Sequence, residues 1–251
     1  MTWLEAVGIF LAGIVAGTIN TVVGSGSLIS FPTLLAAGLD PVTANVTNTV
    51  GLVPGSVSGA VGYRRELRGQ QRRLVRLGAA GLIGGLIGGV LLLVLDEGVF
   101  QAVVPVLIVL ACLLVVAQPR LIGWVRGRRD GRRPADAGSW LTWVFILAAS
   151  VYGGYFGAAQ GVLYMAVLGL GVDDSWQRLN AVKNVVAVGV NGVAALLFAL
   201  VADVEWAMAG VLAAGAIVGG QVGASVGRRL PDWALRGVIV LIGVVAVVAF
   251  V

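Results

Sequence analysis

The sequence predicts an all-α integral membrane protein built from two repeats of inverted topology, with about 8–10 transmembrane helices that include short or broken ones. Three observations lead to this prediction. The composition is 59% hydrophobic and 12% charged, with a mean hydropathy of +0.98, whereas a soluble domain carries about 25% charged residues. Two uncharged runs are longer than one membrane span. The second half of the chain also repeats the order of elements in the first half.

The two long uncharged runs are Ala6–Leu39 and Ser139–Val172, each of 34 residues. One helix of this length would measure about 50 Å at a rise of about 1.5 Å per residue, but the hydrocarbon core of a bilayer is only about 30 Å thick. Each run must therefore break, and polar, glycine-rich breaks in apolar runs are where transporters expose backbone groups to a solute. The predicted breaks are Gly24-Ser25-Gly26-Ser27, with Pro32 just beyond, and the stretch from Gly153-Gly154 to Gln160-Gly161.

An internal repeat appears at an offset of 135 residues, at which Asn45 matches Asn180 and Gly84-Gly85 matches Gly219-Gly220. Upstream, Gly24 matches Gly161 after a small shift. We expect a first repeat at 1–117, a flexible basic cytoplasmic linker at 118–139 and a second repeat at 140–251. The expected helices are 4–23, 27–38, 41–62, 77–95 and 99–117, with counterparts at 140–159, 161–172, 179–202, 206–226 and 233–251.

The charges predict how the repeats are oriented. Fifteen of the 17 basic residues lie in three short regions, 63–76, 118–139 and 228–236, which marks these regions as cytoplasmic. The acidic turns at Asp96-Glu97 and Asp203–Glu205 are expected outside, as are both termini. In the repeat, each acidic turn corresponds to a basic region of the other half, so corresponding points lie on opposite faces of the membrane. The second helix of each repeat is too short to cross alone and suits a re-entrant piece. Basic loops of this kind also contact anionic lipid, and they argue against a nucleic-acid partner.

Several classes of chemistry are excluded. With one cysteine, Cys112, no internal disulfide can form, and the absence of histidine excludes imidazole metal sites and Ser-His catalysis. The chain has no P-loop, and its glycine-rich break lacks the third glycine and the βαβ context of a dinucleotide loop. We therefore expect no enzyme activity, no catalytic residues, no metal and no cofactor.

Glycines recur every four residues in the fourth helix of each repeat, at Gly81, Gly85 and Gly89 and again from Gly215 to Gly227. Small residues at this spacing lie on one helix face and allow close helix packing. Packing is the favoured interpretation, and a smooth face on which one repeat rocks against the other is the functional alternative. Gln221, on the second of these helices, is expected to bond across helices, and a role in a site is the alternative.

Polar residues concentrate in the third helix of each repeat. Asn45 and Asn48 are three residues apart, as are their repeat equivalents Asn180 and Lys183, so each pair shares one helix face. Lys183 is the only ionisable residue within an otherwise apolar span, and such residues are functional candidates. The alternatives are that Lys183 snorkels to the interface and that the amides only join neighbouring helices.

The sign of the charge at membrane depth favours an anion. No Asp or Glu lies inside a predicted span, so a cation has no obvious ligand there, whereas Lys183, the amides and the backbone N–H groups at helix starts all suit an anion. The predicted substrate-binding residues are Ser25, Gly26, Ser27, Asn45, Asn48, Gln160, Asn180, Lys183 and Asn184.

Four segments resemble the TauE/SafE sulfite-exporter family of bacterial permeases: GIVAGTINTVVGSGSLISFPTLLAAGL, DPVTANVTNTVG, the YRR after the third helix, and AVKNVVAVGVNGV. The resemblance covers almost the whole chain. It implies a multi-pass protein of the bacterial plasma membrane that carries sulfite, an organosulfonate or a related sulfur anion. The family's motifs fall on Gly24–Ser27, Ala44–Asn48 and Asn180–Asn184; the first break reads GSGS where family members often carry more consecutive glycines.

The leading hypothesis is therefore a secondary transporter of a small anion, most simply a sulfur oxyanion or organosulfonate, that works by alternating access. An anion channel and a non-transporting membrane assembly subunit are the alternatives, and a membrane-embedded enzyme is disfavoured. The expected partners are the anion and membrane lipid, and a homo-oligomer stays open.

Overall fold

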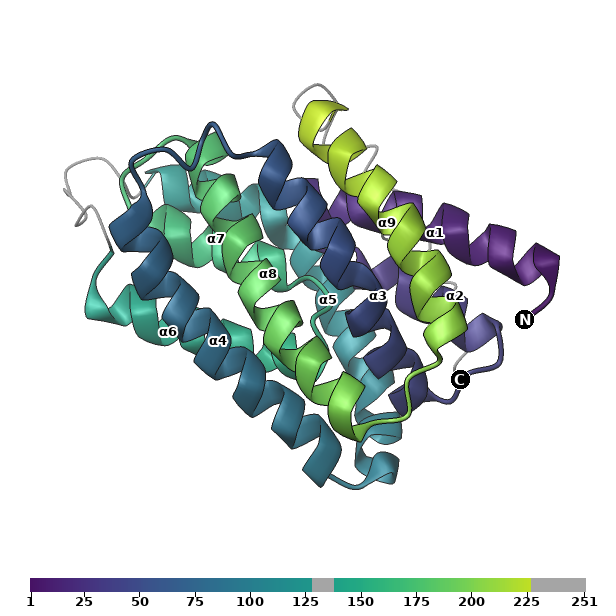
Figure 1. The fold of residues 1–251 in the computed structure, drawn as a ribbon. Coiled ribbons are helices and arrows are strands. Elements are labelled where there is room, and N and C mark those ends of the chain that lie inside the picture. The colour runs from purple at the N-terminus through teal and green to yellow at the C-terminus, as the bar shows by residue number, and fades with distance from the viewer. Residues whose placement is uncertain (128–137, 227–251) are drawn as a thin grey trace.

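The computed structural model describes residues 1–127 and 138–226, and in these ranges the chain is α-helical (Figure 1). An all-α integral membrane fold is thereby confirmed. The helices of the first half are α1 (Trp3–Val22), α2 (Ser27–Ala36), α3 (Pro41–Gly62), α4 (Gln71–Val94) and α5 (Glu97–Gly127). Those of the second half are α6 (Trp140–Tyr155), α7 (Gln160–Gly171), α8 (Trp176–Val201) and α9 (Trp206–Val226).

Five of these helices, α1, α4, α5, α8 and α9, are long and apolar enough to cross a membrane. The helix α3 has 22 residues, but its polar side chains leave it outside this set. The shorter apolar helices are α2, α6 and α7. Exposed apolar side chains such as Leu82, Leu86 and Val106 face outward from α4 and α5, as expected for a surface in contact with lipid.

Side-chain caps begin four helices. The hydroxyl of Thr2 accepts from Glu5 N at the start of α1, and that of Ser139 accepts from Thr142 N at the start of α6, both in capping boxes. Asp40 accepts from the N–H groups that follow Pro41 in α3, and Ser175 caps α8. Each cap satisfies backbone donors that a helix start leaves free, which explains why these boundaries are sharp.

The long uncharged runs break as predicted. In the first run, α1 ends at Val22 and α2 begins at Ser27, and Gly24 between them has a φ of +86°. In the second run the break lies at 156–159, where Gly157 and Ala159 both have positive φ. Two details differ from the prediction. Pro32 lies inside α2, and Gly153-Gly154 lies inside α6, where these glycines serve packing instead of the turn.

The helices α6 and α7 form a hairpin whose two outer ends lie together. A Cβ added to Gly171, at the end of α7, would meet the side chain of Thr142 in the first turn of α6. The helices α1 and α2 also contact each other, and Gly26 packs on the backbone of Ala16 and on Asn20. The short second helix of each half therefore folds back beside the first.

The two halves exchange their fourth helices. The helix α9 of the second half packs on α1 and α3 of the first, while α4 of the first half packs on α6 and α8 of the second. Glycines allow these contacts, because a Cβ on Gly13 or Gly17 of α1 would overlap the backbone of α9, and one on Gly84 or Gly88 of α4 would overlap that of α6. The glycine spacing thus serves close packing, as the pattern favoured.

Two boundaries differ most clearly from the expectation. The helix α4 begins at Gln71 instead of Leu77, and α5 continues to Gly127, within the range 118–139 expected as linker. The rest of that linker up to residue 137 and the expected last span, 233–251, lie outside the described residues. The inverted orientation of the halves in the membrane stays a prediction. Glu205, expected outside, contacts Thr47 near the start of α3, at the helix end opposite the basic loop after Tyr63.

Candidate functional site

The two helix breaks touch each other. The backbone N–H of Gly161 donates a 3.1 Å hydrogen bond to the carbonyl oxygen of Gly24. A Cβ on either glycine would overlap backbone atoms of the other, so glycine is required on both sides. These positions are the predicted repeat equivalents, and the contact places the tips of the two hairpins together between the halves.

Three predicted site residues of α8 converge on the end of α1. Lys183 donates through Nζ to the carbonyl oxygens of Asn20 and Thr21, at 3.2 and 3.1 Å. Asn180 and Asn184 each donate through Nδ2 to the same Thr21 oxygen, at 3.3 Å. Carbonyls in the last turn of a helix have no partner within the helix and carry partial negative charge, so these donors cap the broken end of α1.

The opposite half makes the corresponding contact. Asn45 of α3, the repeat equivalent of Asn180, donates through Nδ2 to the carbonyl oxygen of Tyr155, the last residue of α6, at 2.9 Å. Each third helix therefore caps the broken first helix of the other half. Asn48, the equivalent of Lys183, instead bonds α2 of its own half: it donates to Ser27 Oγ at 3.2 Å and accepts from Ser30 Oγ. The structure thus does not bring Asn48 to the Thr21 carbonyl with Lys183.

Gln160 lies at the start of α7, and both its amide nitrogen and its amide oxygen are hydrogen-bonded. It donates to Asn191 Oδ1 at 3.1 Å and accepts from the hydroxyl of Tyr164, which in turn contacts Ser150. The N–H groups of Gln160 and Gly161 are also bonded, to Gly157 and Gly24. The helix-start N–H groups at Gln160-Gly161 are therefore not free in this conformation, because Gln160 bonds a carbonyl of its own turn and Gly161 bonds one of the other break.

The first break retains free polar groups. The backbone N–H groups of Ser25, Gly26 and Ser27 have no acceptor among the described residues. Ser25 Oγ, Asn45 Oδ1 and Asn180 Oδ1 are buried and likewise have no partner there. An unsatisfied buried polar group costs about 1–3 kcal/mol, and such groups concentrate where a ligand or water completes the network. All six belong to predicted site residues.

Lys183 is fully buried, with 0% exposure. The ion pairs recorded among the described residues involve Glu5 and Asp174, so Lys183 has no carboxylate partner in this part of the chain. Its counter-charge is limited to the partial charge of the α1 end. An isolated buried ammonium is costly unless a counter-charge lies beside it.

Comparison with known proteins places the chain in a family. The family profile described as "Sulfite exporter TauE/SafE" matches residues 9–250. The chain belongs to this family. It is a multi-pass membrane transporter, and its family and bacterial relatives fit the plasma membrane. No solved structure matches this TauE/SafE chain.

Relatives of this TauE/SafE chain carry similarly general names. The "Probable membrane transporter protein YfcA" of Escherichia coli K12 is 26% identical over 247 residues, which cover 94% of this chain and 86% of the relative. A "Probable membrane transporter protein" of Haemophilus influenzae is 25% identical over 236 residues, 93% of this chain and 89% of the relative. A third, "Probable membrane transporter protein ORF9" of a Sinorhizobium species, is 26% identical over 227 residues, with coverages of 86% and 80%.

Sequence reasoning missed the acceptor side of the site in this TauE/SafE protein. Asn20 and Thr21 contribute backbone carbonyls. Every residue has a backbone carbonyl, so the pattern of side chains does not predict which carbonyls will accept a hydrogen bond. The available signal was position, because both residues lie directly before the Gly24 break, where the last carbonyls of a helix need outside partners. The side chain of Asn20 also ties the break to α3, since its Nδ2 donates to Ser56 Oγ at 3.1 Å.

Proposed function

We propose that this TauE/SafE protein is a secondary transporter that carries a small anion, a sulfur oxyanion or organosulfonate such as sulfite, by alternating access. The observation that carries the proposal is Lys183, a fully buried lysine with no carboxylate partner among the described residues, held at a helix break. A bound anion supplies the missing counter-charge in a medium where an unpaired charge is costly.

The donors around Lys183 support the same reading. The Thr21 oxygen accepts from Lys183, Asn180 and Asn184, but a carbonyl oxygen has only two lone pairs. Lys183 also has a third N–H beyond its bonds to Asn20 and Thr21. The cluster therefore holds more donors than its protein acceptors can serve, and oxyanions are acceptors with several lone pairs.

The free groups suit an oxyanion in particular. The N–H groups and hydroxyl at 25–27 are donors at a helix start, which favours negative charge. Asn45 Oδ1 and Asn180 Oδ1 are acceptors, and they suit the hydroxyl of a protonated oxyanion or a water that accompanies the anion. Two observations support alternating access: the breaks of the two halves meet at Gly24 and Gly161, and the halves exchange their glycine helices.

Purified protein in liposomes tests the proposal. Uptake of sulfite, sulfate, thiosulfate and small sulfonates is measured over a range of concentrations, with wild type compared with Lys183→Met and Lys183→Arg. We expect at least one of these anions to be transported with saturation. Lys183→Met should reduce its transport at least about tenfold, because removing one partner of a buried charged contact costs about 2–5 kcal/mol, and Lys183→Arg should retain more.

The matched control is Gln221→Ala, which removes another polar side chain that bonds across helices, to Ser58. It should transport as wild type does. Folding of each variant is checked by thermal unfolding in detergent. A folded Lys183→Met protein that transports every anion at the wild-type rate would contradict the site, and flux that rises linearly without saturation would favour a channel.

A further inference from the structure

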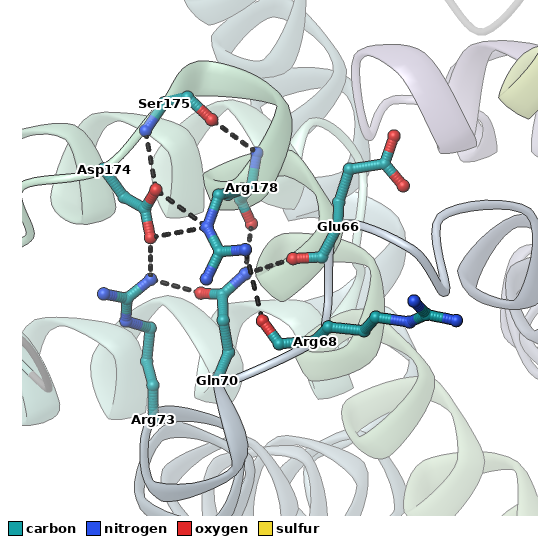
Figure 2. Close-up of polar contacts among 7 residues, drawn as sticks. All are labelled: Glu66, Arg68, Gln70, Arg73, Asp174, Ser175 and Arg178. Carbon is teal, nitrogen blue, oxygen red and sulfur yellow. Dashed lines mark hydrogen bonds and ion pairs between the residues drawn. The ribbon is translucent and has the colours of Figure 1, made fainter.

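A cluster of charged residues joins the two halves at the end of the molecule that carries the basic loop after α3 (Figure 2). Arg73 of α4 pairs through Nη1 with Asp174 Oδ2 at 2.8 Å, and Arg178 of α8 pairs through Nε with Asp174 Oδ1 at 2.9 Å. Asp174 also accepts from the N–H of Ser175 at 2.8 Å. One carboxylate thus links the start of α4 to the start of α8.

Further hydrogen bonds join the same two segments. Gln70 accepts from Arg73 and donates through Nε2 to the carbonyl oxygens of Glu66, at 2.8 Å, and Arg178, at 3.3 Å. Arg178 Nη1 donates to the carbonyl oxygen of Arg68 at 3.2 Å. Figure 2 shows the side chains of Gln70 and Arg73 pointing toward those of Asp174 and Arg178, which come from the other half. We call Arg73, Asp174 and Arg178 the latch.

The side chains of the latch are partly buried and partly exposed to solvent. The side chains of Arg73, Asp174 and Arg178 are 8%, 16% and 34% exposed. Burial alone would raise the pKa of Asp174, but the hydrogen bonds from Arg73 and Arg178 lower that pKa below its usual value. A pocket of about 550 Å³ opens beside these residues, lined by Gly69, Gln71, Arg72 and Asp173 together with the latch. Solvent therefore reaches the latch from its own end of the molecule.

The rest of the seam between α4 and α8 is smooth. Gly81 and Gly85 of α4 pack on Val186 and Val190 of α8, and Gly89 packs on Leu197 and Phe198. Such contacts are non-directional and permit sliding. The charged and directional contacts recorded between these helices are those of the latch and Gln70, so they set the register of the seam.

The latch lies close to the proposed site along one helix. Arg178 and Lys183 are five residues apart on α8, about 7–8 Å along the helix axis. Separation of the start of α8 from α4 would therefore open a path from the pocket toward Asn180 and Lys183. With the latch closed, these residues are buried.

We infer that Arg73, Asp174 and Arg178 form a conformational latch that closes the proposed anion site from this end, and that it must open in each transport cycle. This inference rests on the proposed alternating access. On the predicted topology the latched end is cytoplasmic.

A labelling experiment tests the latch without depending on transport. In a Cys112→Ala background, Asn184→Cys places a thiol in the proposed site, and its reaction with a membrane-impermeant thiol reagent is followed in protein oriented by tag-specific capture. Adding Asp174→Asn should speed labelling from the latched end at least about fivefold, because it removes the carboxylate that holds both arginines. Adding Arg76→Gln should not, since Arg76 lies on the same helix but bonds Gly138 O. Equal labelling rates in all three proteins would overturn the latch.

Cross-linking gives the second readout. The pair Arg73→Cys/Asp174→Cys in the same background is joined by a short cleavable bifunctional thiol reagent, with a monofunctional reagent of the same chemistry as control. We expect the cross-link to abolish anion flux in liposomes and cleavage to restore it. Undiminished flux through cross-linked protein would overturn the inference. If wild type carried none of the tested anions, the proposed function would be refuted instead. The labelling rates would still show whether the latch closes the site.

Discussion

The N–H of Gly161 and the carbonyl of Gly24 join two turns that lie more than half the chain apart and occupy equivalent places in the two halves. Neither position can accept a side chain without moving the other. The centre of the molecule is therefore a backbone-to-backbone contact, flanked on both sides by amides that cap the broken helices.

The contact predicts a sharp sensitivity at Gly161. We expect Gly161→Ala to lower the free energy of unfolding by about 1–3 kcal/mol or more, because its Cβ would overlap Gly24 and Val23, both backbone. Thermal unfolding of purified protein in detergent measures the effect. The matched control is Gly192→Ala in α8, which has open space around its Cβ and should be neutral or stabilising by up to about 1 kcal/mol. Equal effects of the two substitutions would show that the breaks do not meet this closely.

The cap made by Asn45 predicts an order among substitutions. Asn45→Asp keeps the shape but cannot donate to the Tyr155 carbonyl when ionised, and it adds a negative charge beside that oxygen. We expect Asn45→Asp to be less stable than Asn45→Ala, and Asn45→Ala to be less stable than wild type by about 1–3 kcal/mol. Unfolding midpoints of the three proteins decide this, and a more stable Asn45→Asp would mean that Asn45 has another partner.

The lowered pKa of Asp174 sets the pH window of the latch. A depressed carboxyl pKa stabilises the folded state above the ordinary value, about 3.9, and that contribution is lost as the pH falls through the lower pKa of the folded protein. The difference in unfolding midpoint between wild type and Asp174→Asn should therefore be constant from about pH 8 to pH 5 and shrink below about pH 4. A difference that changes between pH 8 and pH 6 would assign the pH dependence to another group.

The predicted orientation has a direct check. In the Cys112→Ala background, a cysteine at Asp203 should react with an impermeant reagent added outside intact cells, whereas one at Arg68 should react only after the membrane is opened. Asp203 follows α8 and Arg68 precedes α4, at opposite ends of the bundle. The reverse pattern would invert the topology and place the latch outside.

Comparison of predicted and observed helix boundaries shows which of them local sequence patterns can predict. The bounds of α3, 41–62, and the start of α9 at residue 206 were predicted as they are observed. An acidic residue precedes both starts, Asp40 before α3 and Glu205 before α9. The start of α4 was missed, because Arg72, Arg73 and Arg76 resemble a loop in sequence. The structure makes them helical by giving Arg73 a carboxylate from the other half and Arg76 the carbonyl of Gly138.

For the candidate site, too, one part could be predicted from the sequence and another could not. The residue set around the breaks was predictable, because an uncharged run too long for the bilayer must break and polar residues at membrane depth need partners. Which residues meet was not predictable: Asn45 and Asn48 share a face by spacing, yet one caps the opposite half and the other bonds its own.

The membrane class, the two broken runs and the polar third helices could be predicted before the fold was known, since they follow from hydropathy, helix geometry and the spacing of residues close in the chain. Three contacts appear only in the folded molecule: the breaks touch at Gly24 and Gly161, Lys183 faces the end of α1, and Arg73 reaches Asp174. These contacts join residues far apart in the chain. No local pattern encodes which distant carbonyl or carboxylate a donor will find.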